Sequence, residues 1–433
     1  MNAIRRVSQS SFFRGVIAIA GGTALAQAVG VLLSPLLTRL YTPEAVGLWG
    51  LFMSFLGVTS VAATLRYEVA IVAASSEEEA LALTRSSLVL GLGVGLLGAL
   101  ALEGLRRGHL LGYGALPAWA SFLAFPALVA FAWGTALRYY GVRRGAFGRV
   151  GRFTVTQGVA RPLAQLLLAF LGGAGLLLGE VLGRFLGLIA LWRLLPRTSG
   201  PWFSPGVLAR YRTYPLVQLP SGFLNMLALM APVPVFTALY GPAVGGGLAL
   251  AQRVVGLPVS LIGAAVADVF YGRAAELARE RPQALRGFLL ATAFRLFLLA
   301  LPFGLALWFL APRFAPWVFG SAWEEAGRMM AAMAPWMVAQ MTVSSVSRAV
   351  FLSKKAWVKF VYDLAALAVF GAPFYLHGQG QAVWVLGLIS WLNVALYVFY
   401  LLVLIWITGP KELWGYRSSG AFLNSEVLTE EVQ

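Results

Sequence analysis

The sequence lacks cysteine altogether and has few charged residues for its length. Charged residues make up 12% of its 433 positions, about half of the roughly 25% that is usual in soluble domains. This number of charged residues is too small for the water-exposed surface of a soluble protein of this size. Most of the surface must therefore face lipid. The absence of cysteine excludes disulfides, thiolate catalysis and cysteine-bound metals.

The motifs of several enzyme classes are also missing. No GxxxxGK[ST] loop is present to bind ATP phosphates and no HExxH to bind zinc. The two histidines, His109 and His377, fall in or near predicted outer loops and do not form a metal cluster. No large loop carries paired carboxylates for glycosyl transfer. We therefore expect a protein that binds and moves a substrate, not an enzyme, with no cofactor and no metal.

Long apolar runs fill the chain instead. A bilayer core about 30 Å thick needs roughly 20 apolar residues to span it as a helix. The sequence contains twelve such runs, at approximately 14–38, 45–73, 80–102, 118–141, 153–172, 175–195, 214–239, 243–271, 285–310, 327–352, 358–376 and 380–407. The start of the chain mimics a signal peptide, but its apolar run is long enough to span, and we expect it to be retained.

The positions of the basic residues predict the orientation. The net charge is +16, and the basic residues concentrate in alternate loops, as the positive-inside rule describes. With the N-terminus inside, loops such as 143–152, 193–212 and 273–286 are cytoplasmic and rich in arginine, whereas the outer loops hold few basic residues. We expect both termini in the cytoplasm and a multi-pass protein of a bacterial or archaeal cytoplasmic membrane, with no nucleic acid as partner.

One segment of the sequence occurs twice. The stretch "SPLLTRLYTPEAVGL" (34–48) matches "VPVFTALYGPAVGGG" (233–247) at six of fifteen positions, and Arg39 of the first copy corresponds to Ala238 of the second. An offset near 200 residues equals six helices, so both copies enter the membrane in the same direction. The pattern predicts an all-α membrane protein with two six-helix bundles, 1–200 and 201–410, related by a pseudo-twofold axis along the membrane normal, and a cytoplasmic tail, 411–433.

Charged residues inside apolar runs are candidate functional residues, since charge at depth in a membrane is costly. Arg253 and Arg295 are predicted near mid-depth, and Arg39 at the outer end of the first helix. Arg66 and Glu68 are predicted near the inner end of the second helix. Arg39 can also be read as an interfacial residue, and Arg66 and Glu68 as headgroup anchors.

Other polar residues at depth allow two readings each. Glu180 and Arg184 have the i,i+4 spacing of an intrahelical ion pair, so we expect a structural role. Asp268 and Asp363, with Glu68, are candidates for coupling to proton or sodium movement. Gln27 and Asn225 can form interhelical hydrogen bonds or contact sugars.

Three prolines lie within the predicted membrane helices. Pro35, Pro234 and Pro258 remove backbone hydrogen bonds from the first, seventh and eighth helices. Paired breaks in corresponding helices of two repeats are typical of transporter binding sites and gates. We therefore expect these prolines to act as hinges, Pro35 and Pro234 as a matched pair.

The first half of the sequence resembles a known family. The stretches "TRLYTPEAVGLW", "RYEVAIV", the acidic loop "SSEEE" that follows, and "ARPLAQLLLAF" are similar to the Wzx-type O-antigen flippases, in the polysaccharide-exporter branch of the multidrug/oligosaccharidyl-lipid/polysaccharide (MOP) superfamily. The resemblance implies twelve helices around a central cavity and alternating access. It also implies movement of a polyprenyl-pyrophosphate-linked oligosaccharide from the inner to the outer leaflet, for O-antigen or exopolysaccharide synthesis.

Within that resemblance, arginines of a cationic cavity would hold the pyrophosphate. Arg253 is the deepest candidate, and Arg39 and Arg66 are secondary ones. The implied partners are the lipid-linked glycan, a coupling proton or sodium ion, and other polysaccharide-assembly proteins.

Alternative functions remain open at this point. A lipid II flippase would be expected to have fourteen helices, and a cation-coupled multidrug exporter a deep carboxylate, which the first helix lacks. A membrane glycan polymerase or ligase would be expected to carry a large outer loop, whereas every predicted outer loop here is short. A purely structural scaffold would leave Arg253 and Arg295 unexplained.

Overall fold

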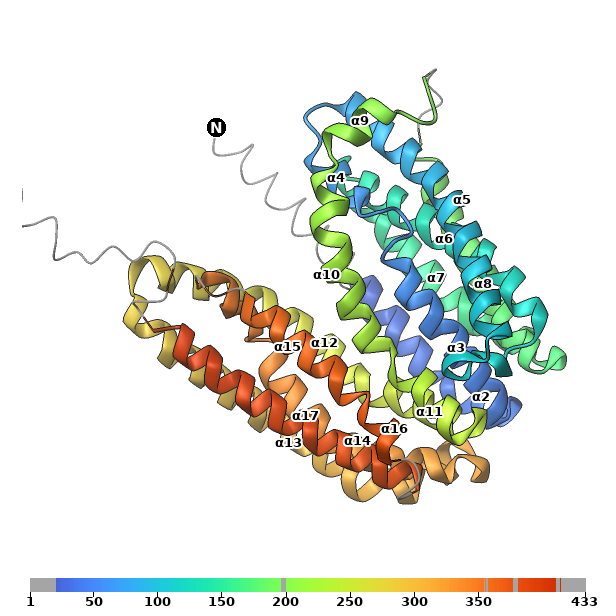
Figure 1. The fold of residues 1–433 in the computed structure, drawn as a ribbon, viewed down its shortest axis with the longest axis vertical. Coiled ribbons are helices and arrows are strands. Elements are labelled where there is room, and N and C mark those ends of the chain that lie inside the picture. The colour runs from blue at the N-terminus through green and yellow to red at the C-terminus, as the bar shows by residue number, and fades with distance from the viewer. Residues whose placement is uncertain are drawn as a thin grey trace, which may run out of the picture. The chain divides into compact units, whose positions relative to one another are not determined.

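The computed structural model describes residues 21–195, 200–353, 355, 357–376, 381–409 and 413. These residues are helical or in turns, apart from one isolated bridge between Ser353 and Leu413. After a helical stretch that starts at residue 21, the elements up to the middle of the chain are α2 (Ser34–Leu40), α3 (Pro43–Ser60), α4 (Tyr67–Ala73), α5 (Glu77–Arg107), η1 (Leu110–Ala115), α6 (Ala118–Arg143), α7 (Phe147–Leu167), η2 (Ala169–Leu171), α8 (Gly173–Trp192) and α9 (Pro205–Arg210) (Figure 1). The later elements are α10 (Thr213–Met230), α11 (Pro232–Tyr240), α12 (Pro242–Glu280), α13 (Pro282–Phe319), η3 (Ser321–Trp323), α14 (Glu324–Ser344), η4 (Ser347–Leu352), α15 (Trp357–Val369), α16 (Ala372–Leu376) and α17 (Ala382–Ile407).

Each of the twelve predicted apolar runs overlaps a helix or a pair of helices. Among the described residues, eight helices are long and apolar enough by themselves to cross a membrane, and α10 with α11, bent by 42°, makes a ninth if the pair is counted as one span. The protein is therefore an all-helical, multi-span membrane protein. The count of twelve spans stays a prediction, as does the cytoplasmic position of the termini. The residues before 21, and all of the predicted tail except Leu413, lie outside the described part.

Capping and charge explain where two of the helices begin. Thr42 accepts a hydrogen bond from the amide of Ala45, 3.3 Å away, and Pro43 follows as the first residue of α3. Ser76 caps α5 in the same way at 3.1 Å from the amide of Glu79. The first turn of α5 is acidic and its last turn basic, the distribution that the helix dipole favours.

The described residues form two compact units. One contains the described parts of Met1–Leu257, Ala306–Ala334 and Ala366–Ser390, and the other those of Pro258–Leu305, Pro335–Ala365 and Trp391–Gln433. The long helices α12, α13, α14 and α17 contribute to both units, so the division falls within helices. The division of the chain near residue 200 into two bundles stays a prediction.

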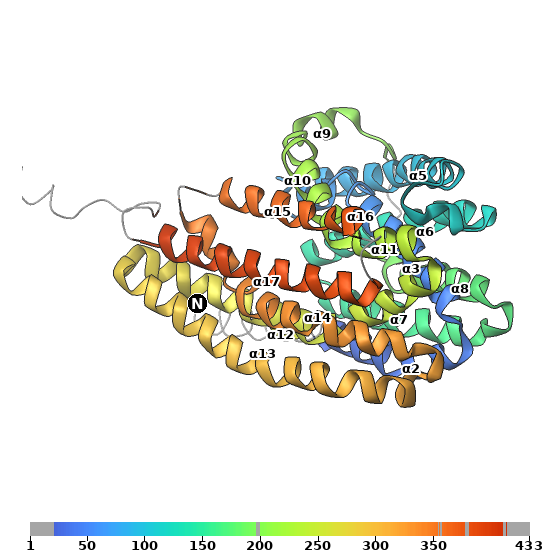
Figure 2. The same ribbon diagram turned by 60° about the horizontal axis from the view of Figure 1, so that its bottom comes forward.

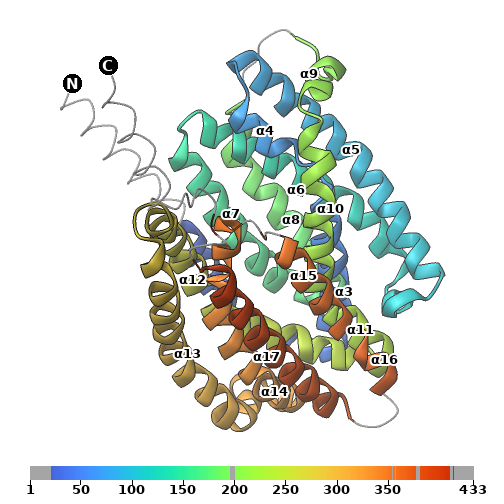
Figure 3. The ribbon, with the colours of Figure 1, turned by 60° about the vertical axis from the view of Figure 1, so that its left-hand side comes forward.

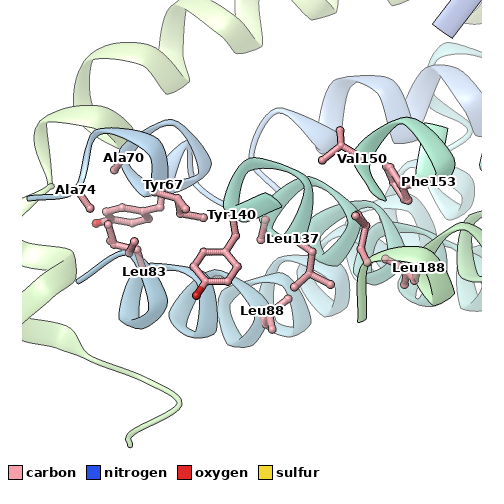
Figure 4. Close-up of a cluster of buried hydrophobic side chains, with 14 of the residues drawn as sticks. Tyr67, Ala70, Ala74, Leu83, Leu88, Leu137, Tyr140, Val150, Phe153 and Leu188 are labelled. Atoms are coloured by element: carbon pink, nitrogen blue, oxygen red, sulfur yellow. The ribbon is translucent and has the colours of Figure 1, made fainter. Parts of the chain in front are cut away.

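The first unit has an apolar core between α4, α5, α6, α7 and α8. Its largest fully buried members include Tyr140, Ile71, Leu83 and Leu137 (Figure 4). α5 and α6 run side by side, as do α7 and α8 (Figure 3). This packing holds the first half of the chain as a set of long helices.

The second unit has its own core, where the end of α12 pairs with the start of α13. The two helices run antiparallel and side by side on either side of Arg281 (Figure 2). Phe270 and Phe288 stack with ring centroids 5.4 Å apart and planes inclined by 4°. Buried residues of α14 and α17 complete this core.

Some of the predicted membrane helices are interrupted, and only some interruptions lie near the predicted hinges. In the first span, a one-residue turn at Leu33 precedes α2, whose second residue is Pro35. The seventh breaks at Ala231, three residues before Pro234, so Pro232 begins the second segment. α12 continues as a helix past Pro258. The gating role of the three prolines stays a prediction.

The break in the second predicted helix was not anticipated. α3 ends at Ser60, and turns over 61–66 separate it from α4. Leu65 (φ 50°) and Arg66 (φ 65°) both adopt the left-handed conformation, which strains residues with side chains. Residues 61–66 contain no glycine or proline, so no local breaker residue predicts this break.

Arginines bind the acidic loop that follows α4. Arg143, at the end of α6, donates from Nη1 to the carbonyls of Ile71, Val72 and Ala74 at 3.3, 3.0 and 2.8 Å. Arg143 also pairs with Glu77 at 3.3 Å. This arginine therefore caps the carboxyl end of α4, where carbonyls have no helical partner.

The segment between the predicted halves packs on the first unit. The hydroxyl of Tyr67 donates to the carbonyl of Leu208 at 3.1 Å, and Arg210 pairs with Glu79. The guanidinium of Arg85 lies 5.6 Å from the ring centroid of Trp202. The short helix α9 is thereby fixed against the start of α5.

Candidate functional site

Arg253 lies in the first turns of α12, and its guanidinium points toward the first span. Eleven residues from the start of that helix correspond to about 16 Å along its axis, close to the predicted mid-depth. Its Nη2 donates to the carbonyl of Gly30 at 2.7 Å, and its Cζ lies 5.8 Å from the ring centroid of Trp49. Among the described residues no carboxylate forms an ion pair with it.

The carbonyl of Gly30 accepts from a second side chain besides Arg253. The carbonyl of Gly30 also accepts a hydrogen bond from the hydroxyl of Ser34 at 2.8 Å. A Cβ on Gly30 would stand 3.0 Å from Nη2 of Arg253, tighter than ordinary packing. The glycine therefore gives the guanidinium access to the main chain.

A small cavity adjoins Arg253. Its volume is about 20 Å³, enough for about one water molecule. The polar or aromatic residues lining it are Ser34, Thr38, Trp49, Gln165 and Arg253. The indole Nε1 of Trp49 is buried and has no hydrogen-bond acceptor among the described residues. A larger ligand would require the lining helices to separate.

Tyr41 contacts Gln165, one of the residues that line the cavity. Its hydroxyl donates to the carbonyl of Gln165 at 2.5 Å, while the Gln165 amide donates to the carbonyl of Leu176 at 3.2 Å. Burial raises the pKa of Tyr41 to about 12. The phenol therefore stays protonated, and remains a donor, across the physiological range.

A second charged cluster joins α7 to α8. Glu180, whose exposed fraction is 1%, pairs with Arg184 at 2.8 Å and with Arg161 at 3.2 Å. The predicted i,i+4 pair between Glu180 and Arg184 is confirmed. The guanidinium of Arg184 also lies 5.7 Å from the ring centroid of Phe131. Arg161 was not anticipated, although it lies in the segment "ARPLAQ".

The helices carrying Arg161 and Arg253 meet on the first span. A Cβ on Gly158 of α7 would overlap Ala26 of the first span. Gly30 lies one turn after Ala26, and Arg161 lies one turn after Gly158. The structure thus brings Arg161 to the level where Arg253 binds Gly30.

The other predicted binding residues lie elsewhere, with one exception. Gln27 is part-buried in the first span, three residues before Gly30. Arg39 is exposed and donates to the carbonyl of Trp317 at 3.2 Å, and it does not line the cavity. Arg295 belongs to the second unit, where its side chain is exposed on α13.

Arg66 and Asn225 lie on facing elements. Nη2 of Arg66 lies against Gly222 of α10, where any side chain would overlap it. Asn225 follows one turn later on α10 and is exposed. Nε of Arg66 is buried without an acceptor among the described residues. Neither residue lines the cavity beside Arg253.

The three predicted ion-coupling residues have different surroundings. Glu68 is buried, accepts a hydrogen bond from Thr64 and pairs with Arg66 at 3.6 Å. Asp363 pairs with Lys359 of its own helix. The side chain of Asp268 lies outside the described part of the structure. Within the described residues, no group of three or more side chains is suited to hold a metal ion.

Solved structures with a similar fold are transporters. The chain matches a structure of the lipid II flippase MurJ in an inward closed conformation, with 16% identity, 89% of this chain and 87% of that chain covered, and a TM-score of 0.67. It also matches an inward-facing multidrug resistance MATE family transporter of the MOP superfamily, with 17% identity, 89% and 93% covered, and a TM-score of 0.59. A eukaryotic MATE transporter matches with 15% identity, 92% and 96% covered, and a TM-score of 0.54.

Sequence comparison identifies the family. No curated protein sequence matches the chain. The sequence profile of a family described as "Polysaccharide biosynthesis protein" matches residues 36–328, which is more than half of the chain. The solved structures described above show that the chain has the fold of the MurJ and MATE proteins. The chain belongs to the polysaccharide biosynthesis protein family, and its buried arginines lie on a fold that it shares with the MurJ and MATE structures.

Proposed function

We propose that this protein is a flippase that moves a polyprenyl-pyrophosphate-linked oligosaccharide from the inner to the outer leaflet by alternating access. The glycan would serve the synthesis of O-antigen or another exopolysaccharide. Membership of the polysaccharide biosynthesis family and the MOP-superfamily fold support a substrate of this kind.

The observation that carries the proposal is the environment of Arg253. Its guanidinium donates to one main-chain carbonyl, and no carboxylate among the described residues pairs with it. The unpaired indole N–H of Trp49 lies at the same cavity. A positive charge and a free donor at depth in a membrane favour an anionic ligand, and planar arginine donors match phosphate oxygens.

The physics of such transport is simple. The polyprenyl tail can remain in lipid while the polar head crosses through the protein. Outward movement of negative charge in an inside-negative cell is favourable by about 2.3 kcal/mol per charge per 100 mV. Coupling to protons or sodium ions through Glu68, Asp268 or Asp363 is part of the proposal, as is the placement of both termini in the cytoplasm of a bacterium or archaeon.

Two related functions are the alternatives. A lipid II flippase would also carry a lipid-linked substrate, and the similar MurJ structure is described as one. A cation-coupled multidrug exporter would share the fold of the MATE structures. The lack of a carboxylate paired with Arg253 favours an anionic substrate over cationic drugs.

The direct test is translocation of a radiolabelled polyprenyl-pyrophosphate glycan in proteoliposomes. We compare wild type, Arg253→Ala and Arg253→Lys after matching expression and thermal stability. Wild type should move the lipid, Arg253→Ala should lose most of the rate, and Arg253→Lys should restore part of it, because lysine keeps the charge but not the planar donors.

Arg313→Ala provides a matched control. Arg313 also donates to a main-chain carbonyl, that of Phe309 at 2.8 Å, but it is exposed near the end of α13. This variant should transport as wild type does. A wild-type protein that moves no lipid-linked glycan but exports small cations along an ion gradient would overturn the proposal in favour of a drug exporter.

A further inference from the structure

The charged cluster of α7 and α8 is unbalanced. Among the described residues, Arg161 and Arg184 share one carboxylate, that of Glu180, and Arg253 forms an ion pair with none, so three positive charges stand against one negative charge. Glu180 is almost completely buried. Unbalanced charge at depth is costly unless something neutralises it. The net positive charge of the cluster therefore favours the binding of an anion.

The two arginines that touch Glu180 are not held equally. Arg184 is nearly buried, with a side-chain exposed fraction of 8%, and pairs at 2.8 Å. Arg161 keeps an exposed fraction of 32% and pairs at 3.2 Å. Its Nε donates to the carbonyl of Gln157 at 3.2 Å, which leaves its other amino group free to take a further acceptor.

We propose that Arg161 is a second anion-binding residue beside Arg253, and that Glu180 positions Arg161 until the ligand takes its place. This inference rests on the proposed function and concerns the same site. The meeting of Gly158 with Ala26 sets Arg161 level with Gly30, to which Arg253 is bound. A pyrophosphate diester carries two negative charges, which equals the unbalanced positive charge.

The arrangement makes Glu180 a competitor of the ligand. While the site is empty, the carboxylate holds Arg161 and limits repulsion between the guanidinium groups. When a phosphate binds, Arg161 can turn to it, and Glu180 retains Arg184. On release, the carboxylate recovers Arg161. Arg184 thus tunes how tightly Glu180 holds Arg161.

Binding of farnesyl pyrophosphate to the full-length protein in detergent micelles, measured by equilibrium dialysis, tests the proposal. Arg161→Gln should weaken binding about tenfold or more, the effect of losing one charge-assisted hydrogen bond, and Arg161→Lys should weaken it less. Glu180→Gln should tighten binding, because the competing carboxylate is gone. Arg184→Gln should weaken it, because Glu180 then holds Arg161 alone.

Glu180→Gln and Arg184→Gln are expected to change the affinity for farnesyl pyrophosphate in opposite directions. If Glu180 and Arg184 had only a structural role, both variants would weaken binding. If Glu180→Gln does not fold, the comparison of Arg161→Gln with Arg161→Lys decides, because partial rescue of binding by lysine is expected only if the charge of Arg161 binds the anion. Arg313→Gln serves as the control and should bind as wild type does. Unchanged binding by Arg161→Gln, with loss in Arg253→Gln, would overturn this inference and leave the proposed function standing. Failure of wild type to bind the probe would overturn both.

Discussion

Gly47 of α3 and Gly246 of α12 lie against each other. The two glycines are equivalent positions of the internal repeat, in which residues 34–48 match residues 233–247. A Cβ on Gly47 would overlap the carbonyl of Pro242, and one on Gly246 would overlap the carbonyl of Pro43. Pro43 and Pro242 are also equivalent positions of the repeat. The contact is therefore reciprocal, as a local twofold relation between two repeats requires.

We expect Gly47→Ala to destabilise the protein. The added methyl group has no room, and overpacking of this kind costs about 1–3 kcal/mol. Thermal unfolding in detergent measures the effect. Gly104→Ala is the control, because a Cβ there would meet nothing within 4 Å; its stability should stay the same or rise slightly. Equal stability of both variants would contradict the observed closeness of α3 and α12.

A disulfide between α3 and α12 should stop transport. A Cβ on Gly50 would stand 3.1 Å from that of Ala249, slightly under the 3.5–4.5 Å that is usual in disulfides, and the natural chain has no cysteine to interfere. Gly50→Cys combined with Ala249→Cys should lose transport under oxidation and recover it with reductant. Both single-cysteine variants should be insensitive to oxidation. Full transport by the cross-linked protein would show that these helices need not separate.

Arg143→Ala should lower the free energy of unfolding by about 1–3 kcal/mol, because it leaves three carbonyls at the end of α4 without a donor. Arg149→Ala is the matched control: Arg149 is exposed in the same basic region, and its loss should change stability by less than about 0.5 kcal/mol. Thermal or denaturant unfolding of the two variants compares them. An equal effect would argue against the capping role.

Tyr41→Phe should reduce stability by about 0.5–1.5 kcal/mol through loss of the hydrogen bond to Gln165. The pKa of Tyr41 is raised to about 12 in the folded protein, above its usual value near 10. The contribution of the neutral phenol to the free energy of unfolding is therefore fully present below about pH 10, and it is lost as the pH rises toward 12. The free energy of unfolding can be measured for both proteins from pH 7 to 11. The difference between wild type and Tyr41→Phe should stay constant up to about pH 10.

Strain at the break between α3 and α4 can be measured at Leu65. Leu65→Ala and Leu65→Gly remove nearly the same side chain, but only glycine accepts the left-handed conformation without strain. We expect the glycine variant to be more stable than the alanine variant by about 1 kcal/mol. Greater stability of the alanine variant would place that strain in doubt.

The sequence predicted those features that depend on neighbours in the chain. Apolar runs located the helices, and the spacing of Glu180 and Arg184 predicted their ion pair. In each case the interacting residues lie within a turn or two of one another, so periodicity and composition were sufficient.

Features built by distant segments were not predictable in this way. Trp49 approaches Arg253 across some two hundred positions, and Arg161 reaches Glu180 from a different helix. The break at Leu65 depends on packing against other elements, not on a local breaker residue. A single sequence carries no direct record of such contacts, which is why Arg161 was missed and Arg39, though singled out, lies outside the cavity.

The ion pair within α8 also bears on the biogenesis of the protein. Lone charges at the centre of an inserting helix cost about 2.5–3.5 kcal/mol each, but Glu180 and Arg184 enter the bilayer on one helix, already neutralising each other. Arg253 follows later in synthesis, when its acceptor Gly30 and the ring of Trp49 have already been inserted. Of the three arginines near Glu180, only Arg161 precedes its partner, by 19 residues. The order of the chain thus brings Arg184 and Arg253 into a membrane that already holds the groups that receive them.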